Sequence, residues 1–165
     1  MIKGLLLTIV VFGAFATAEK VSAQTPHHDH AFLWTVTAGM QDLGVPVGWS
    51  DSYANGISRN GVIVEYVGNS DTGNLAAAVW SVQTGWQILS HRLNQQYSAA
   101  YAINNARQIA GTTYAAGSTT EHAFLWTATT GMQDLGTLGG STSFAFGIND
   151  KGEVVGQSDN GQRRW

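Results

Sequence analysis

The chain has 165 residues, of which 44% are hydrophobic and only 12% charged, with 20 glycines, no cysteine and a net charge of −3. This length allows one ordinary domain, and the composition favours short strands and tight turns over helices or disorder. The mild negative charge argues against a nucleic-acid partner and against a polybasic membrane patch. Without cysteine no disulfide can form, so stability must come from the core and from strand pairing.

Residues 1–23 have the pattern of a signal peptide. A short positive start containing Lys3 precedes an apolar stretch over 5–18, and small residues at 21–23 offer a cleavage site before Gln24, with an earlier alternative at 16–18. The apolar stretch is short for a transmembrane helix, although a retained anchor stays open as the alternative. We therefore expect a secreted or periplasmic protein, without membrane contact once this segment is removed, that continues with a polar leader at 24–29.

The rest of the chain, residues 30–165, reads as a single domain of repeats. Trp34, Trp80 and Trp126 are each separated by 46 residues, and Ile57, Ile103 and Ile148 follow at intervals of 46 and 45. The repeats span residues 30–75, 76–121 and 122–165, the last of them truncated. A fixed period of this length is typical of propellers and solenoids, in which one repeat cannot bury its apolar face alone.

Each repeat is predicted to contain four short antiparallel strands separated by glycine-bearing turns. The predicted strands cover residues 31–37, 40–43, 52–58 and 62–67, then 76–82, 86–89, 99–104 and 108–113, and finally 123–127, 132–135, 144–149 and 153–157. Four strands in about 46 residues match a β-propeller blade. A sandwich stays possible but does not explain the strict period. The predicted fold is therefore all-β, with propeller-like repeats.

Three motifs recur in one order: HAFLWT at 30–35 and 122–127, GMQDLGTLGG at 131–140 and INDKGEVVG at 148–156. Together they resemble the HAF-type extracellular repeat family, over about residues 30–158. The resemblance implies an exported, repetitive all-β protein, and it brings no catalytic residues. The second repeat departs from the pattern at 76–79 and at Trp86, and the first carries Glu65 where the others have Gly111 and Gly156.

The phase of the repeat predicts an incomplete ring. If each blade begins with the hairpin around Ile57, Ile103 or Ile148, the chain holds an outer half-blade (30–44), two whole blades (about 52–90 and 98–136) and an inner half-blade (143–158). These add to three blades, whereas closed propellers have four to eight. Either further repeats complete the ring in a longer protein, or chains self-associate, for example by exchanging halves to make six blades.

The tryptophans and isoleucines of the repeat, Trp34, Trp80, Trp126, Ile57, Ile103 and Ile148, are predicted to be structural core residues, because they recur at one place in every repeat. Trp49 and Trp86 lie outside this pattern and are the candidate ligand-binding residues. His27 and His28 can share a divalent ion, but on a polar leader they are weak candidates for a metal site.

No catalytic site is identified in the sequence. Asp42 and Asp134 occupy equivalent places in different repeats, so nothing makes them a catalytic pair. Nucleophile-elbow and phosphate-binding patterns are absent, and no cofactor is expected. The sequence favours an exported binding or structural module with an unknown extracellular ligand. The alternatives are an extracellular propeller enzyme acting on glycans, as a hydrolase or lyase, and a fragment of a longer repeat protein.

Overall fold

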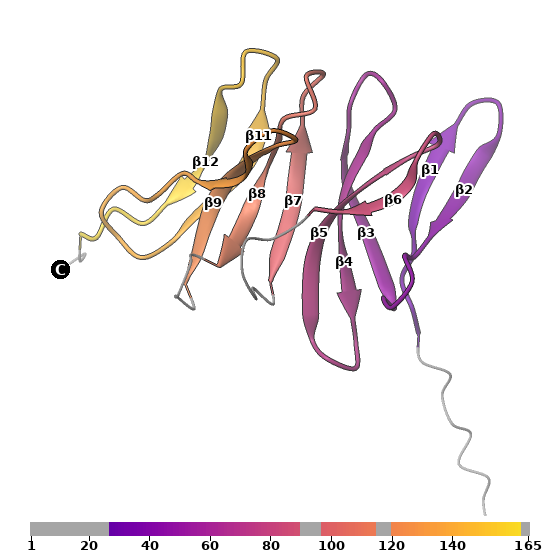
Figure 1. Ribbon diagram of the computed structural model, residues 1–165, viewed down its shortest axis with the longest axis horizontal. Helices are drawn as coiled ribbons and strands as arrows, with labels where there is room; N and C mark the ends of the chain where they lie inside the picture. Colours follow the sequence, from indigo (N-terminus) through magenta and orange to yellow (C-terminus); the bar gives the residue numbers. More distant parts are fainter. Residues whose placement is uncertain (1–26, 90–96, 115–119, 163–165) are drawn as a thin grey trace, which may run out of the picture.

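The computed structural model describes residues 27–89, 97–114 and 120–162, where every regular element is a β-strand (Figure 1). The strands are β1 (Ala31–Thr35), β2 (Gly39–Gly44), β3 (Asp51–Ile57), β4 (Ile63–Asn69), β5 (Asn74–Ser81), β6 (Gly85–Ile88), β7 (Ser98–Ile103), β8 (Ile109–Tyr114), β9 (Glu121–Thr127), β10 (Gly131–Asp134), β11 (Ser143–Ile148) and β12 (Val154–Ser158). The predicted signal peptide and residues 24–26 lie outside this part. It contains no helix long and apolar enough to cross a membrane.

The strands form four antiparallel sheets in the phase that the repeat predicts. Two sheets have four strands, in the orders β3-β4-β5-β6 and β7-β8-β9-β10, and the hairpins β1-β2 and β11-β12 form a two-stranded sheet each. The prediction of an all-β fold with incomplete, propeller-like repeats is confirmed. We call the four-stranded sheets the first and second blade, and the hairpins the leading and trailing half-blade.

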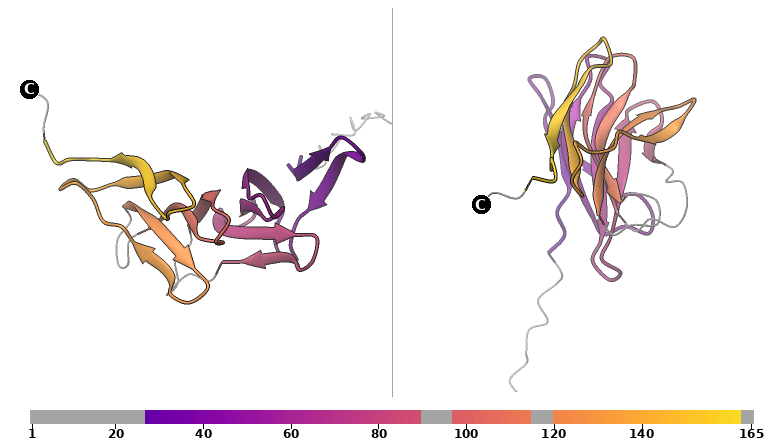
Figure 2. Two further views of the ribbon diagram at one scale, coloured as in Figure 1. Left: turned by 90° about the horizontal axis from the view of Figure 1, so that it is seen from above. Right: turned by 90° about the vertical axis from the view of Figure 1, so that its left-hand side faces the viewer.

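The sheets follow one another in a curved row, with the leading and trailing half-blades at opposite ends (Figures 1 and 2). The leading half-blade touches the first blade through β1 and β3. The first blade meets the second where β3 and β4 lie against β7, and the second blade meets the trailing half-blade where β7, β8 and β9 lie against β11. Because each blade is covered on both faces, β4 and β8 are buried on both sides, and their apolar runs do not alternate. The main core lies between the two blades and is formed by Val62, Val64, Ala77, Val79, Leu89, Ala100, Ile109 and Phe124.

A buried serine hydroxyl joins each sheet to the one before it. Ser52, Ser98 and Ser143 begin the first strand of their sheets, and their Oγ atoms accept the backbone N–H of Ala31, Ala77 and Ala123 at 2.9, 2.9 and 2.8 Å. Ser52 and Ser143 also donate to the carbonyls of Gly44 and Gly136. All three serines are at most 4% exposed. A buried hydroxyl that both accepts and donates is a satisfied polar group, so it can fix the spacing between sheets.

A second set of links connects the turns after β3, β7 and β11. The backbone N–H of Arg59 donates to Asn105 Oδ1 at 3.0 Å, and the N–H of Asn105 donates to Asp150 Oδ1 at 3.0 Å. These residues occupy one place in successive repeats. The turns also share a left-handed residue, which is glycine at 61 and 152 but Arg107 in the second blade, with φ of +61°.

The first strand of every sheet carries a bulge at the same place. The pairing register shifts between Ala54 and Gly56 in β3, between Ala100 and Ala102 in β7, and between Ala145 and Gly147 in β11. The extra residue is therefore Asn55, Tyr101 or Phe146. A bulge turns a side chain away from the regular alternation of a strand. The bulge position therefore holds a different residue in each sheet, although the backbone around it is the same.

The serine bridges generate a stability prediction. Ser52→Ala and Ser143→Ala each leave a buried N–H and a buried carbonyl without their partner, so each is expected to lower the free energy of unfolding by about 1–3 kcal/mol. Urea denaturation followed by tryptophan fluorescence measures this. Ser70→Ala is the matched control, because Ser70 is exposed and bonds through its backbone N–H. Equal stability of all three variants would contradict the role of the bridges.

Candidate functional site

The predicted core residues differ in how far they are covered. Trp126 and Ile103 pack against the core between the blades, Ile148 packs against the core of the trailing half-blade, and Trp80 is partly buried. Trp34 and Ile57, the copies nearest the leading end of the row, are 60% and 55% exposed.

Trp49 and Trp86, the residues that depart from the repeat, lie partly buried on one small core. Both pack against the cluster of Val67, Ala76 and Ala78. The Trp86 indole N–H also donates to the carbonyl of Leu43, at 3.0 Å. Trp86 thus connects the leading half-blade to the first blade, and its polar atom is already used within the protein.

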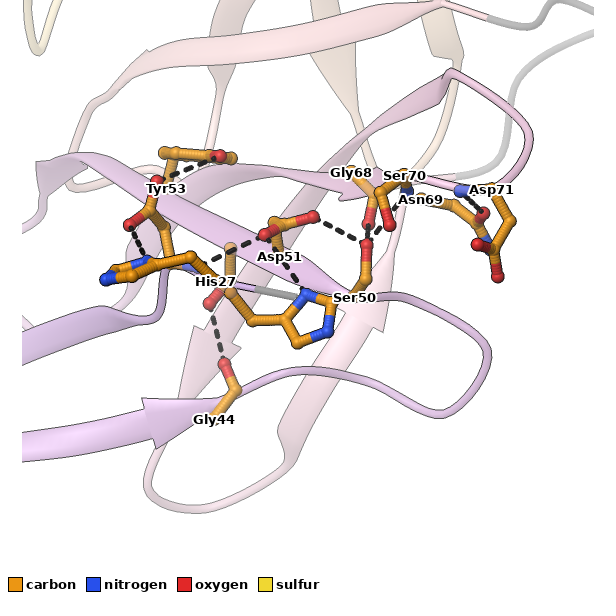
Figure 3. Close-up of polar contacts among 12 residues, drawn as sticks. His27, Gly44, Ser50, Asp51, Tyr53, Gly68, Asn69, Ser70 and Asp71 are labelled. Carbon is orange, nitrogen blue, oxygen red and sulfur yellow. Dashed lines mark hydrogen bonds and ion pairs between the residues drawn. The ribbon is translucent and has the colours of Figure 1, made fainter. Parts of the chain in front are cut away.

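The histidines of the leader meet a polar network around Asp51 (Figure 3). Asp51 accepts the Ser50 hydroxyl and the N–H of Asp29, and these bonds hold the pKa of its carboxyl below the usual value. His28 Nδ1 lies 3.6 Å from Asp51, and His27 Nδ1 lies 3.8 Å from Asp29. Among the described residues no three histidine or carboxylate side chains gather as metal ligands. The network ties the leader to the start of β3.

A histidine–aspartate pair recurs in two repeats. Nδ1 of His30 lies 2.9 Å from Asp42, and Nδ1 of His122 lies 2.8 Å from Asp134. The hydrogen bond from His30 is the main reason that the pKa of Asp42 is lowered. The second repeat has the apolar residues Ala76 and Ile88 at the two places. The two residues therefore occur together or are both replaced. This is expected of a contact that joins a strand to its hairpin partner.

Glu65, in the middle of β4, is fully buried, and neither carboxylate oxygen has a hydrogen-bond partner among the described residues. Burial raises its pKa to about 8. A neutral carboxyl is therefore the form that fits this environment at neutral pH.

The partner of Glu65 explains its position. Glu65 lies opposite Ala78, whereas the equivalent residue in the second blade, Gly111, lies opposite Phe124. A Cβ atom on Gly111 would lie 2.8 Å from the Phe124 ring and closer still to a backbone carbonyl. In the second blade the bulky side chain of this pair is Phe124 on β9. In the first blade it is Glu65 on β4. Glu65 fills space within the fold and does not face a ligand.

The described structure contains a different candidate site, formed by tyrosines. The chain has five tyrosines, and all five lie on the first two strands of the two blades or directly before β7. They are Tyr53 (β3), Tyr66 (β4), Tyr97, Tyr101 (β7) and Tyr114 (β8). Each is partly exposed. We call this set the tyrosine surface.

Ring contacts join four of the tyrosines into two pairs, one in each blade. The rings of Tyr53 and Tyr66 stack at 4.7 Å between centroids, and those of Tyr97 and Tyr114 stack at 5.2 Å. Tyr101, on β7, contributes to the raised pKa of both Tyr97 and Tyr66, so it lies near a member of each pair. The five tyrosines therefore lie on both sides of the boundary between the two blades.

The surface extends onto the trailing half-blade through phenylalanines. The Tyr101 ring lies 6.0 Å from Phe146, which is 54% exposed and stacks in turn on Phe144 at 6.3 Å. Tyr101 and Phe146 are both bulge residues. The backbone irregularity that each repeat shares thus places aromatic rings side by side in neighbouring sheets.

The packing of the repeat does not require these tyrosines. No two of them occupy equivalent places: the other blade has Ala99, Thr112, Asp51, Asn55 and Gly68 at the matching positions, whereas the trailing half-blade has Phe144 and Phe146 at those of Tyr53 and Tyr101. Departure from the repeat pattern distinguishes Trp49 and Trp86 from the other tryptophans, and it distinguishes the tyrosines in the same way. Their gathering could not be seen in the sequence, because it depends on how the two blades face each other.

Three hydroxyls of the tyrosine surface have a raised pKa. Burial is the main cause that raises the pKa of Tyr53, Tyr66 and Tyr97, and nearby Asp29 or Glu121 adds to it. The Tyr53 hydroxyl lies 3.3 Å from the Asp29 carboxylate. The surface thus offers ring faces and neutral hydroxyls with a negative border, which disfavours anionic ligands.

A cleft lies between the blades. It is lined by Trp126 and Ile109 with Arg107 among its polar residues, and its volume is about 140 Å³. Pockets for small organic ligands usually have about 300–1,000 Å³. The cleft is therefore too small to be the main binding site.

Comparison with known proteins identifies no relative. No family model matches the chain, and neither a curated protein nor a solved structure matches it significantly. The resemblance to HAF-type repeats consequently stays a prediction from the motifs.

The buried carboxyl of Glu65 predicts a pH dependence of stability. Its pKa is about 8 in the folded protein, against 4.5 without the fold, so its contribution is fully present below pH 4.5 and is lost as the pH rises to about 8. The stability of the unchanged protein relative to Glu65→Gln should therefore fall by an amount on the order of 4 kcal/mol over this range. Urea titrations of both proteins at several pH values measure it; a constant difference would contradict the burial of an unpaired carboxyl.

Because Glu65 on β4 fills the space that a phenylalanine on the neighbouring strand fills in the second blade, the effects of substitutions at Glu65 and Ala78 on the free energy of unfolding should be strongly coupled. Glu65→Gly alone leaves a void, and Ala78→Phe alone places a ring where Glu65 lies, so both single variants should lose stability. The double variant recreates the pair found in the second blade and should be more stable than the sum of the single effects by about 1–3 kcal/mol. Thermal or urea unfolding of the four proteins gives the coupling energy, and a value near zero would contradict this prediction.

Proposed function

We propose that the protein is an exported binding module that recognises neutral glycans on its tyrosine surface. The single observation that carries this proposal is that all five tyrosines are partly exposed and lie on or beside the first two strands of the two neighbouring blades, where four of them form stacked pairs. Export is supported by the signal-peptide pattern of residues 1–23.

The chemistry of the surface fits sugars better than other ligands. Flat aromatic rings can stack on the apolar faces of sugar rings, and phenol hydroxyls can donate to and accept from sugar hydroxyls. Tyrosine supplies a large contact area at a small cost in conformational entropy, which is why it is enriched in binding surfaces. The Asp29 and Glu121 carboxylates near the surface favour neutral ligands over acidic polysaccharides and nucleic acids.

Binding is favoured over glycan cleavage. A glycosidase needs one carboxyl with a raised pKa to protonate the leaving oxygen. The pKa of Asp51, which is near Tyr53, is lowered because its carboxylate accepts hydrogen bonds from Ser50 and Asp29. Among the described residues, the carboxyl with a strongly raised pKa belongs to Glu65, which is fully buried.

The proposal predicts which variants lose binding. Isothermal titration with neutral hexasaccharides (gluco-, xylo-, manno- and chito-series) should find a ligand whose affinity falls about tenfold or more in Tyr101→Ala and Tyr66→Ala, because each removes a stacking ring. Tyr101→Phe keeps the ring and should retain most of the affinity. An acidic polysaccharide, polygalacturonate, should not bind.

Trp49→Phe is the matched control for this experiment, since it alters an aromatic residue outside the tyrosine surface. Its affinity should equal that of the unchanged protein. The proposal fails if no neutral glycan binds, or if binding is lost in Trp49→Phe and kept in Tyr101→Ala.

A further inference from the structure

The outer edge of β12 lies free in the described structure. The equivalent strands β4 and β8 are each paired on both sides, whereas β12 pairs with β11 alone. At the opposite end of the row, β1 pairs with β2 alone, although its counterparts β5 and β9 are paired on both sides. Each end of the row therefore has the half of a blade that the other end lacks.

The second blade shows what normally lies against the strand equivalent to β12. Phe124 of β9 lies opposite Gly111 of β8, and its ring is fully buried. It is surrounded by the core between the blades, which includes Val64, Ala77 and Ala100. The Phe124 ring thus fills a pocket, here called the seat, in which the absence of a side chain on Gly111 leaves room for the ring.

The same seat exists at β12 with nothing in it. A hollow of about 350 Å³ runs beside this strand, and its lining includes Ala123, Leu135, Ala145, Val154 and Gly156. These five residues are the repeat equivalents of Ala77, Leu89, Ala100, Ile109 and Gly111, which form the seat of Phe124. The hollow is therefore shaped for a phenylalanine on an added strand.

The strand β1 has the matching residue. Phe32 occupies the place of Phe124 in its repeat, and it is 53% exposed. Trp34 on the same face is 60% exposed, while its counterpart Trp126 packs against the core. The ends lie at opposite sides of the molecule (Figure 1), so Phe32 does not reach the hollow of its own chain.

We propose that β1 of a second copy pairs with β12 and places its Phe32 in the hollow above Gly156. The register copied from β8 and β9 sets Gly156 opposite Phe32, Val155 opposite Leu33 and Val154 opposite Trp34. The inserted strand continues an interface that already exists between the blades. The first blade could not supply this seat, because Glu65 stands where the glycine is needed.

Two copies that exchange these contacts form a closed assembly. Each chain contributes two whole blades and two half-blades, so a two-fold dimer contains six blades, which lies within the usual range of four to eight. Both junctions are identical by symmetry, and no sheet edge of this kind stays free.

The register is tested by cross-linking, since the chain contains no cysteine. Leu33→Cys and Val155→Cys are made as two separate proteins and mixed under mild oxidation. Directly opposed residues on paired strands have the separation that a disulfide needs, so a covalent heterodimer is expected in high yield. Thr35→Cys mixed with Val155→Cys is the matched control two residues out of register, and it should give little product.

The seat is tested by sedimentation equilibrium. The unchanged protein should be a dimer, and Phe32→Ala should raise the dimer dissociation constant at least about 100-fold, because it removes the anchor of the interface. Val82→Ala replaces an exposed apolar residue in the turn after β5, away from β1, β11 and β12, and should leave this constant unchanged. A monomeric unchanged protein, a dimer insensitive to Phe32→Ala, or equal yields from the two cysteine mixtures would each overturn the proposal. None of these outcomes depends on glycan binding.

Discussion

The fold depends on one interaction that every repeat makes: a buried serine hydroxyl that joins each sheet to the sheet before it. Ser52, Ser98 and Ser143 accept a backbone N–H from β1, β5 and β9 of the preceding sheet. Ser52 and Ser143 also donate to a carbonyl at the end of the same preceding hairpin. Apolar packing between sheets is not directional, whereas these bonds fix one spacing and one register. They are what makes successive blades equivalent.

Equivalent blades explain both the variable residues and the free ends. Because the serine bridges set the spacing of the sheets, a bulge residue such as Tyr101 can vary without loss of packing. The strand that carries the large side chain of a cross-strand pair can vary too, as Glu65–Ala78 and Gly111–Phe124 show. The same equivalence lets the Phe124 seat be recognised again at Gly156, where it is empty. Binding and assembly are therefore proposed on different parts of a single frame, the tyrosine surface for the first and the half-blade edges for the second.

The sequence predicted the architecture well and the candidate site poorly. The period of Trp34, Trp80 and Trp126 led to four strands per repeat and to the correct phase, because turns and strand alternation are local properties. The serine bridges recur at the same period, but serine is common in turns, and burial was needed to single them out. The stacked pairs Tyr53–Tyr66 and Tyr97–Tyr114 each form between paired strands of one blade, but the contact of Tyr101 with Phe146 joins neighbouring sheets and arises only when those sheets pack. Trp49 and Trp86 also depart from the repeat pattern, but they lie partly buried against a small apolar core. Departure from the repeat therefore does not by itself identify an exposed residue.

Native-state hydrogen exchange tests the central claim most directly. The backbone amides of Ala31, Ala77 and Ala123 lie in β1, β5 and β9, and each donates to a buried serine Oγ of the next sheet. The account predicts that Ala77 and Ala123 exchange as slowly as amides in the centre of β4 and β8, through opening of the whole structure. Fast exchange at these two amides, with slow exchange in β4 and β8, would show that the sheets are not held together by the serine bridges.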